Sequence, residues 1–328
     1  MNFWSGNQAI VEGALTVGAK FYAGYPITPA SEIMELWSEK AANDQGLNFL
    51  QSEDELAAIH HVIGAAISGV PAFTATSGPG LSLMQEGLGL AFTYQAPIVV
   101  VDVMRSGPST GKPTRAGQGE ILGSKYGTHG DVCPFVFYST SVQECYDYTI
   151  KAFQVAWENQ VPVILLSDAY LAHLREQSQP EADSPLAEKI NHQSSVIKHY
   201  SGLIDRKSNS KKIEELTAVS QKKLPDYNLW GNENSDTLLI GLGSMARALR
   251  AFEDEYQIFA PVRVWPFLKK EILATAEGKE NIVVVEMNEG QYVKEVKQVL
   301  GDKVEFVAWR EETINIKRLK KLIRRDAD

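Results

Sequence analysis

Short runs of β-branched and apolar residues alternate with Ala-rich stretches of helical periodicity through the first half of the chain. The runs at residues 72–76, 98–102 and 163–167 have the length and composition of buried strands. Residues 55–68 carry their apolar side chains at helical spacing. Strands that alternate with helices in this way are typical of an α/β fold, in which helices cover a parallel sheet.

The pattern changes twice further along the chain. Residues 176–235 are largely polar, which is typical of a linker or arm. Apolar runs typical of strands then return in four places, at residues 237–240, 262–265, 282–285 and 304–307. We therefore predict three segments, which are an α/β domain at 1–175, a polar arm at 176–235 and a smaller α/β domain at 236–328.

The composition is that of a globular protein and narrows the classes of partner. Of the 328 residues, 44% are hydrophobic and 22% are charged, and the net charge is −9. Since a negative surface repels a phosphate backbone, we expect no nucleic-acid partner. No apolar run approaches the roughly 20 residues that a bilayer requires, and no basic region precedes an apolar stretch at the amino terminus. We expect no membrane contact and a cytoplasmic location.

Three other features of the sequence do not indicate a cofactor or metal site on this chain. Cys133 and Cys145 are the two cysteines of the sequence, and they cannot supply the four thiolates of a typical iron–sulfur cluster or structural zinc site. The basic run at 317–325 has apolar residues at helical spacing, which predicts a terminal helix with a solvated face. Gly241 to Ala246 match a dinucleotide fingerprint, but no acidic residue ends the next predicted strand, so a tight turn is favoured.

The first candidate for chemistry is the sequence Thr76-Ser77-Gly78-Pro79-Gly80, which follows a predicted strand and precedes a predicted helix. Two glycines around a proline permit a tight turn with backbone amides exposed at a helix N-terminus. Ligands of α/β proteins commonly bind at such a turn. Taken alone, the motif is equally compatible with a plain strand-to-helix connection.

Three carboxylates, Glu53, Asp54 and Glu55, lead into the helix predicted at 55–68. Acidic residues at a helix start commonly serve the helix dipole. However, Gly64 lies nine positions after Glu55, and the Thr76–Gly80 turn comes after the next predicted strand. This layout resembles the pyrimidine-binding domain of thiamine diphosphate enzymes, in which a buried Glu holds the N1′ atom of the aminopyrimidine. The resemblance implies that Glu55 has this role, with Glu53 as the alternative.

Two longer strings make the resemblance more specific. They are Tyr25-Pro26-Ile27-Thr28-Pro29 and Arg105-Ser106-Gly107-Pro108-Ser109-Thr110-Gly111-Lys112-Pro113-Thr114. Thr28 and Pro29 also suit the cap and first turn of a helix, which is the structural alternative. With the acidic helix start and the glycine-rich turn, these strings resemble the α subunit of 2-oxoacid:ferredoxin oxidoreductases. Further similarity at 126–131, 265–267 and 285–291 extends the resemblance to both domains.

The resemblance assigns roles residue by residue. It implies that Thr28 and Arg105 hold the carboxylate of a 2-oxoacid, and a guanidinium fork suits a planar carboxylate. A rim salt bridge is the alternative for Arg105. Three nearby side chains are candidates for the distal carboxylate of 2-oxoglutarate: Lys112, Thr110 and Thr114. The residues expected around the cofactor are Glu55, Tyr25, Pro26, Ser77, Gly78 and Gly80.

The sequence lacks motifs that such an enzyme needs elsewhere. Thiamine diphosphate enzymes hold the diphosphate through Mg²⁺ with a Gly-Asp-Gly sequence, which this chain does not contain. The resemblance therefore implies a separate β subunit that carries the diphosphate site, Mg²⁺ and a [4Fe-4S] cluster. Ferredoxin is the expected electron partner, and γ and δ subunits are further candidates. The second domain resembles the C-terminal domain of transketolase, which usually serves subunit packing.

The activity that the resemblance implies is CoA-dependent oxidative decarboxylation of 2-oxoglutarate to succinyl-CoA and CO₂, or the reverse carboxylation. Electrons would pass to or from ferredoxin. Pyruvate and branched-chain 2-oxoacids are alternative substrates, since enzymes for all three share these strings. A non-redox thiamine diphosphate decarboxylase or transketolase-like subunit is the alternative enzyme, and an inactive scaffolding paralogue is the alternative without catalysis.

Overall fold

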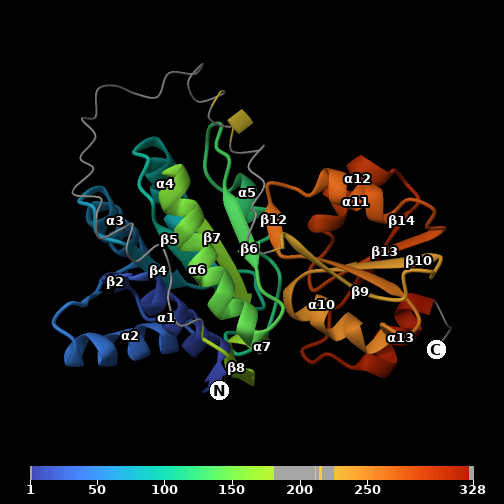
Figure 1. The fold of residues 1–328 in the computed structure, drawn as a ribbon, viewed down its shortest axis with the longest axis horizontal. Coiled ribbons are helices and arrows are strands. Elements are labelled where there is room, and N and C mark those ends of the chain that lie inside the picture. Colours follow the sequence, from blue (N-terminus) through green and yellow to red (C-terminus); the bar gives the residue numbers. More distant parts are fainter. Residues whose placement is uncertain (1, 181–210, 212–213, 216–224, 325–328) are drawn as a thin grey trace.

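Two open sheets organise the computed structural model, which describes residues 2–180, 211, 214–215 and 225–324 (Figure 1). The strands are β1 (Asn2–Ser5), β2 (Phe21–Gly24), β3 (Asn48–Gln51), β4 (Ala72–Thr76), β5 (Val99–Met104), β6 (Phe135–Tyr138), β7 (Val163–Asp168), β8 (Arg175–Ser178), β9 (Tyr227–Gly231), β10 (Thr237–Gly241), β11 (Gln257–Pro261), β12 (Arg263–Trp265), β13 (Asn281–Glu286) and β14 (Val304–Ala308). The helices are α1 (Gly6–Val17), α2 (Ser31–Asn43), α3 (Glu55–Ile67), α4 (Pro79–Thr93), α5 (Gly123–Tyr126), α6 (Val142–Asn159), α7 (Ala169–His173), α10 (Gly243–Leu249), α11 (Lys269–Thr275), α12 (Tyr292–Leu300) and α13 (Ile316–Arg324), with a 3-10 turn, η1, at Arg250–Phe252.

The first domain contains a seven-stranded sheet of order β12-β6-β7-β5-β4-β2-β3. All neighbours are parallel except β12, which runs antiparallel to β6. Strand β5 is buried on both faces: Val99 and Val101 pack in the cluster formed with α1, α2 and α6, whereas Val100 and Met104 pack in the cluster formed with α3 and α4. The predicted α/β class, with helices on both faces of a parallel sheet, is confirmed.

The second domain contains a five-stranded sheet of order β14-β13-β10-β11-β9. Its neighbours are parallel except β9, which runs antiparallel to β11. One face packs with α10 and α13, where Leu319 and Ile323 of α13 are buried. This confirms the terminal helix predicted from the basic run, since its apolar stripe faces the sheet. Among the described residues, no helix combines the length and apolarity needed to cross a bilayer.

Strand β12 corrects the strand assignment made for residues 262–265. The sequence pattern placed this run in the second domain, but Arg263 and Trp265 pair with β6 of the first sheet. The backbone N–H of Tyr138 also donates to the carbonyl of Val262 at 2.7 Å. The strand that the second sheet uses is β11, which ends just before it. An apolar run of three or four residues has the same pattern in either sheet, so the pattern alone could not decide between them.

The expected segment boundaries stay predictions, because most of residues 176–235 lies outside the described residues. Two described pieces of that range belong to the domains, since β8 pairs with β1 and β9 joins the second sheet. At the turn of Gly241–Ala246, which matches the dinucleotide fingerprint, the ring of Tyr138 occupies the space beside Gly243. A Cβ on Gly243 would lie 2.0 Å from Cζ of Tyr138, so the two domains are in contact there.

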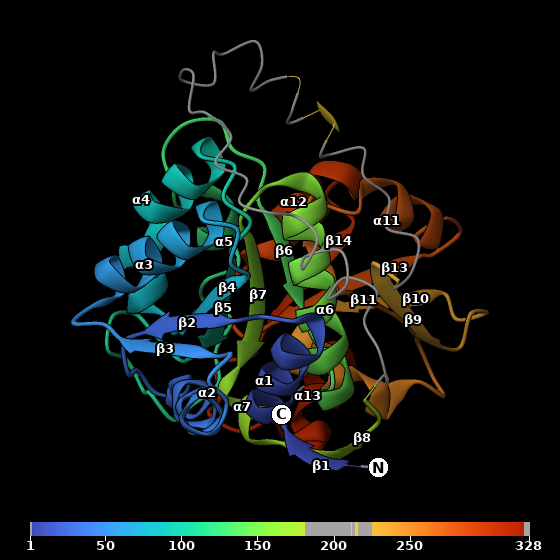
Figure 2. The ribbon, with the colours of Figure 1, turned by 60° about the vertical axis from the view of Figure 1, so that its left-hand side comes forward.

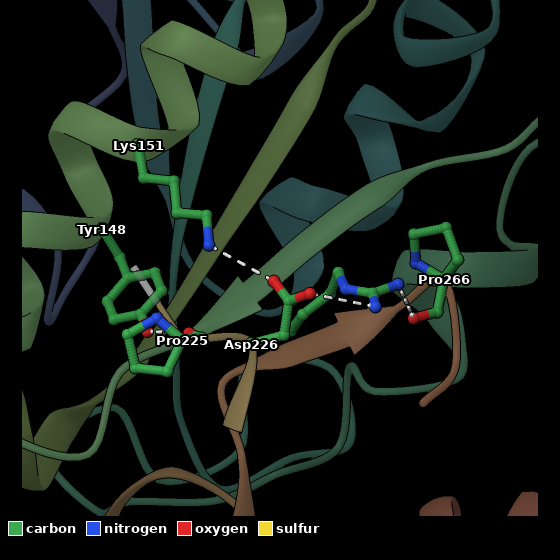
Figure 3. A network of polar contacts seen from close by, with 6 residues as sticks. Tyr148, Lys151, Pro225, Asp226 and Pro266 are labelled. Carbon is green, nitrogen blue, oxygen red and sulfur yellow. Dashed lines mark hydrogen bonds and ion pairs between the residues drawn. The ribbon is translucent and has the colours of Figure 1, made fainter. Parts of the chain in front are cut away.

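A network of ion pairs connects the segment before β9 to both α6 and β12 (Figure 3). Oδ1 of Asp226 lies 3.2 Å from Nζ of Lys151 on α6, and its Oδ2 lies 3.1 Å from Nη2 of Arg263 on β12. The side chains of the two cations are 3% and 7% exposed. Burial lowers the pKa of Lys151, and the charge of Asp226 opposes that shift. One carboxylate therefore compensates two buried cations.

We expect Asp226→Asn to destabilise the protein by about 3 kcal/mol or more, because it removes the carboxylate that pairs with both Lys151 and Arg263. Urea unfolding of the purified protein measures this loss. The matched control is Asp302→Asn, which removes an exposed carboxylate and should change the free energy of unfolding by less than about 0.5 kcal/mol. Equal effects of the two substitutions would show that the network contributes nothing.

Candidate functional site

Strands β2, β3, β4 and β5 are parallel neighbours, so their carboxyl ends meet at one edge of the first sheet (Figure 2). The segments that leave these ends carry the sequence-predicted residues. They are Thr28 after β2, Glu55 after β3, Ser77, Gly78 and Gly80 after β4, and Arg105 after β5. Ligands of open α/β sheets bind outside the carboxyl ends of the strands. The topology therefore gathers residues from four distant parts of the sequence in one place.

Glu55 is the first residue of α3 and is 5% exposed. The helix starts here because Asp54 is its N-cap, with Oδ1 accepting the N–H of Ala57 at 2.7 Å. A Cβ on Gly80 would lie 2.6 Å from Oε1 of Glu55, so the carboxylate packs directly against the glycine-rich turn. Glu53, the alternative, is exposed. The structure thus places Glu55, and not Glu53, beside the turn.

The turn at Thr76–Gly80 presents buried polar atoms to this edge. Gly78 adopts φ +47°, a conformation that favours glycine, and its N–H donates to Oδ1 of Asp102 at 3.2 Å. In the described part of the chain, Oγ1 of Thr76 and Oγ of Ser77 are buried without a hydrogen-bond partner. Buried hydroxyls usually have partners, so two such groups beside a buried carboxylate indicate a place where a ligand supplies them.

Arg105 is 5% exposed and connects the ends of β5 and β2. Its Nη1 donates to the backbone carbonyl of Thr28 at 2.7 Å, so the structure brings these two predicted residues together. Its Nε is buried and, among the described residues, has no hydrogen-bond partner. No carboxylate of the described chain lies within ion-pair distance of this guanidinium. The rim salt bridge considered for Arg105 is therefore absent from the described part.

Two acidic residues that sequence reasoning missed lie beside Arg105. Asp102 is fully buried in β5, and Glu120 is partly buried in the loop before α5. Burial raises the pKa of Asp102, and the charge of Glu120 raises it further. Burial also raises the pKa of Glu120 to about 7. One signal was present in the sequence, since Asp102 is a single acid inside the apolar run of Val99–Met104.

A cleft of about 890 Å³ opens beside these groups, between the two domains. The first domain contributes Gly78, Arg105 and Glu120 to its wall, and the second domain contributes Asn288 and Trp309. Its volume is in the range of sites for small molecules and cofactors. Arg105 thus combines a buried guanidinium with access to an open cleft.

The second domain positions the loop that carries Glu120. Gln118 is fully buried, and its Nε2 donates to the carbonyl of Leu242 at 2.8 Å and to the hydroxyl of Tyr138 at 3.1 Å. Its Oε1 accepts the N–H of Met287 at 2.9 Å. A fully satisfied buried amide fixes a loop strongly, because breaking its contacts leaves polar groups without partners. The string at 285–291 therefore supports one wall of the cleft.

Three predicted residues lie on the loop after Arg105 and do not line the cleft, and their assignment to a distal carboxylate stays a prediction. Thr110, Lys112 and Thr114 are exposed and do not line it. The loop folds back on itself, with an isolated bridge between Ser106 and Lys112, and Nζ of Lys112 pairs with Glu312 of the second domain. The three residues are near Arg105 in sequence, but they do not line the cleft that Arg105 lines.

Two further predicted residues do not line the cleft. Tyr25 and Pro26, expected around the cofactor, are exposed in the connection between β2 and α2. Among the described residues, no group of three or more His, Cys, Asp or Glu side chains could hold a metal ion.

Comparison with known proteins identifies the family to which this arrangement belongs. Residues 12–222 match the family model described as "Pyruvate flavodoxin/ferredoxin oxidoreductase, thiamine diP-bdg", that is, thiamine diphosphate-binding. The chain belongs to this family. The 2-oxoglutarate synthase subunit KorA of Archaeoglobus fulgidus is 36% identical over 94% of both chains. The ketoisovalerate oxidoreductase subunit VorB of Methanothermobacter marburgensis is 32% identical over 90% of this chain and 89% of that one.

A solved structure has the same fold as this chain. It is the 2-oxoglutarate:ferredoxin oxidoreductase from Magnetococcus marinus with 2-oxoglutarate, coenzyme A and succinyl-CoA bound, and the TM-score is 0.83 at 27% sequence identity. The match covers 98% of this chain and 65% of that chain, so the present chain spans about two thirds of the length of that relative. The resemblance inferred from the sequence motifs is confirmed.

The residues at the carboxyl edge fit the pyrimidine end of thiamine diphosphate. Glu55 offers a buried carboxyl group, which accepts a hydrogen bond from a ring N–H when ionised and donates one to a ring nitrogen when protonated. The unpartnered hydroxyls of Thr76 and Ser77 flank it, and Gly80 lacks the Cβ that would collide with Thr76 and Glu55. A buried carboxyl group, two hydroxyls without partners among the described residues and the close approach that Gly80 permits make this edge of the sheet suitable for a heteroaromatic ring.

Proposed function

We propose that this chain is the α subunit of a 2-oxoglutarate:ferredoxin oxidoreductase. In this proposal the enzyme oxidatively decarboxylates 2-oxoglutarate with CoA to succinyl-CoA and CO₂, or runs the reverse carboxylation, in the cytoplasm. The observation that carries it is the meeting of Glu55 and Arg105 around the Thr76–Gly80 turn in a member of the thiamine diphosphate-binding family. The similarity to KorA and to the Magnetococcus enzyme supports 2-oxoglutarate as the substrate.

Each residue of the site has one task in this proposal. Bound thiamine diphosphate supplies carbanion stabilisation for loss of the carboxyl carbon. Glu55 holds the pyrimidine ring and carries the proton exchanged with it, because a carboxylate in a fixed position beside a ring nitrogen is a competent acid–base group. Arg105 binds the substrate carboxylate, and its bond to the carbonyl of Thr28 fixes the guanidinium plane. The interdomain cleft orients the substrate at this point.

The remaining parts of the active site belong to a partner in this proposal. A β subunit holds the diphosphate through Mg²⁺ and carries the [4Fe-4S] cluster that passes electrons to ferredoxin. The two cysteines of the present sequence, both buried, are fewer than the four thiolates of such a cluster. γ and δ subunits are further candidates. The names of the relatives, which are subunits, support an assembly of several chains.

Co-expression of this chain with the product of the adjacent gene tests the proposal. We expect a brown complex that reduces a viologen dye in the presence of 2-oxoglutarate and CoA, and no such activity from the chain alone. A substrate panel with pyruvate and 2-oxoisovalerate measures the preference, since a relative acts on ketoisovalerate by its name. A preference for one of those acids would correct the substrate. A colourless complex that releases CO₂ would replace the ferredoxin-linked reaction with a non-redox decarboxylase.

A further inference from the structure

Arg105 lies in a group of three charged side chains whose charges do not balance. Asp102 is on β5, Arg105 follows the same strand, and Glu120 is on the loop that the second domain supports. All three surround Gly78. Its N–H binds Oδ1 of Asp102 at 3.2 Å, and a Cβ on it would lie 3.5 Å from Oε1 of Glu120 and 3.8 Å from Nε of Arg105. Two carboxylates thus face one guanidinium within a few ångströms of a single residue.

Both carboxyl groups have an oxygen without a partner. Among the described residues, Oδ2 of Asp102 and Oε2 of Glu120 are buried and accept no hydrogen bond. A buried ionised carboxylate normally receives hydrogen bonds or pairs with a cation, and neither oxygen does so here. With both groups ionised, the cluster would carry one uncompensated negative charge. One added proton makes it neutral.

We propose that Asp102 and Glu120 hold one proton between them, and that Glu120 is a positioning residue whose protonated form prepares Arg105 for the substrate carboxylate. This inference rests on the function proposed above. A substrate carboxylate beside Arg105 adds a negative charge to the cluster. The cluster accepts that charge when it is neutral and repels it when both carboxyl groups are ionised.

The other charged groups around the cluster do not remove this dependence. Across the cleft, Glu289 and Arg310 form a bidentate ion pair with each other, with Nη2 to Oε2 at 2.6 Å, so their charges cancel locally. Glu311 on the same wall is paired with Arg318 at 2.6 Å. Glu55, the first residue of α3, is a further acidic side chain of the site. These neighbours supply no extra cation to offset Asp102 and Glu120.

The direction of titration agrees with the geometry. Burial raises the pKa of both groups, and that of Glu120 reaches about 7. Below this pH the cluster holds its proton, and above it the proton is lost. Since the bound carboxylate favours the protonated form, substrate binding takes up a proton near pH 7, and affinity falls as pH rises.

The test compares KM for 2-oxoglutarate between pH 6.5 and 8.5 in the co-expressed complex. For the wild type we expect KM to rise roughly tenfold over this range, in line with one proton whose pKa lies near 7. Glu120→Gln is neutral at every pH, so its KM should stay close to the wild-type value at pH 6.5. At pH 8.5 the variant should therefore bind substrate more tightly than the wild type. A merely structural role of Glu120 predicts a weaker enzyme at every pH.

A second measurement does not depend on the variant. Calorimetric titration of the wild-type complex with 2-oxoglutarate, in buffers of different ionisation enthalpy, gives the number of protons taken up, and we expect a fraction of one proton at pH 7. Asp302→Asn is the control, because it removes an exposed carboxylate that does not line the cleft and should leave the uptake unchanged. If the complex turns over 2-oxoglutarate but takes up no proton on binding it, and its KM does not change with pH, this inference alone is wrong. A complex that uses no 2-oxoacid overturns the proposed function instead.

Discussion

Replacing Glu55 by Gln is expected to lower turnover of the complex by about 10² to 10⁴-fold, which is the usual contribution of a general acid–base group. The amide keeps the size of the side chain and its packing against Gly80, but it cannot carry the exchanged proton. Deuterium exchange at C2 of bound thiamine diphosphate reports this step directly, and we expect it to become undetectably slow. Binding of thiamine diphosphate, measured separately, shows whether the variant still holds the cofactor.

The matched control for Glu55 is two residues away. Glu53→Gln makes the same chemical change at an exposed position, so exchange and turnover should stay within about twofold of the wild type. Normal C2 exchange in the Glu55 variant would remove Glu55 from this role. Loss of exchange in the Glu53 variant would restore the alternative that the sequence left open.

The parts of the fold set by local pattern could be predicted from the sequence. The buried run at β5 and the acid-capped start of α3 follow from apolar periodicity and from the side chain of Asp54, and both need only neighbours in sequence. Pairing is different, because it depends on contacts between distant segments. Strand β12 joined the first sheet, where Arg263 and Trp265 pair with residues of β6 that lie more than a hundred positions earlier in the sequence.

The candidate site likewise contains residues that the sequence indicated and residues that only the tertiary structure brings together. Glu55 and Arg105 could be proposed in advance because each stands in a string that resembles the 2-oxoacid:ferredoxin oxidoreductases. Glu120 stands in no such motif, and its loop is held by contacts of Gln118 with Leu242 and Met287 of the second domain. Lys112 is in the motif, yet its charge is drawn to Glu312 on the outside of the molecule. The positions of Glu120 and Lys112 therefore depend on tertiary contacts and ion pairs, which the spacing of residues in the sequence does not show.

Replacing Arg105 by Met is expected to raise KM for 2-oxoglutarate about a hundredfold, because it removes a charged hydrogen-bond donor from the carboxylate while keeping much of the apolar stem. In free energy this is about 3 kcal/mol. Thiamine diphosphate should bind as before, since Glu55 and the hydroxyls beside it are untouched. The control is Arg115→Met on the same loop, where the guanidinium is exposed and pairs with Glu312 at 3.2 Å, and KM should stay within about twofold. An unchanged KM in the Arg105 variant would mean that the substrate carboxylate binds elsewhere, because a buried guanidinium in contact with the substrate cannot be lost without weakening binding.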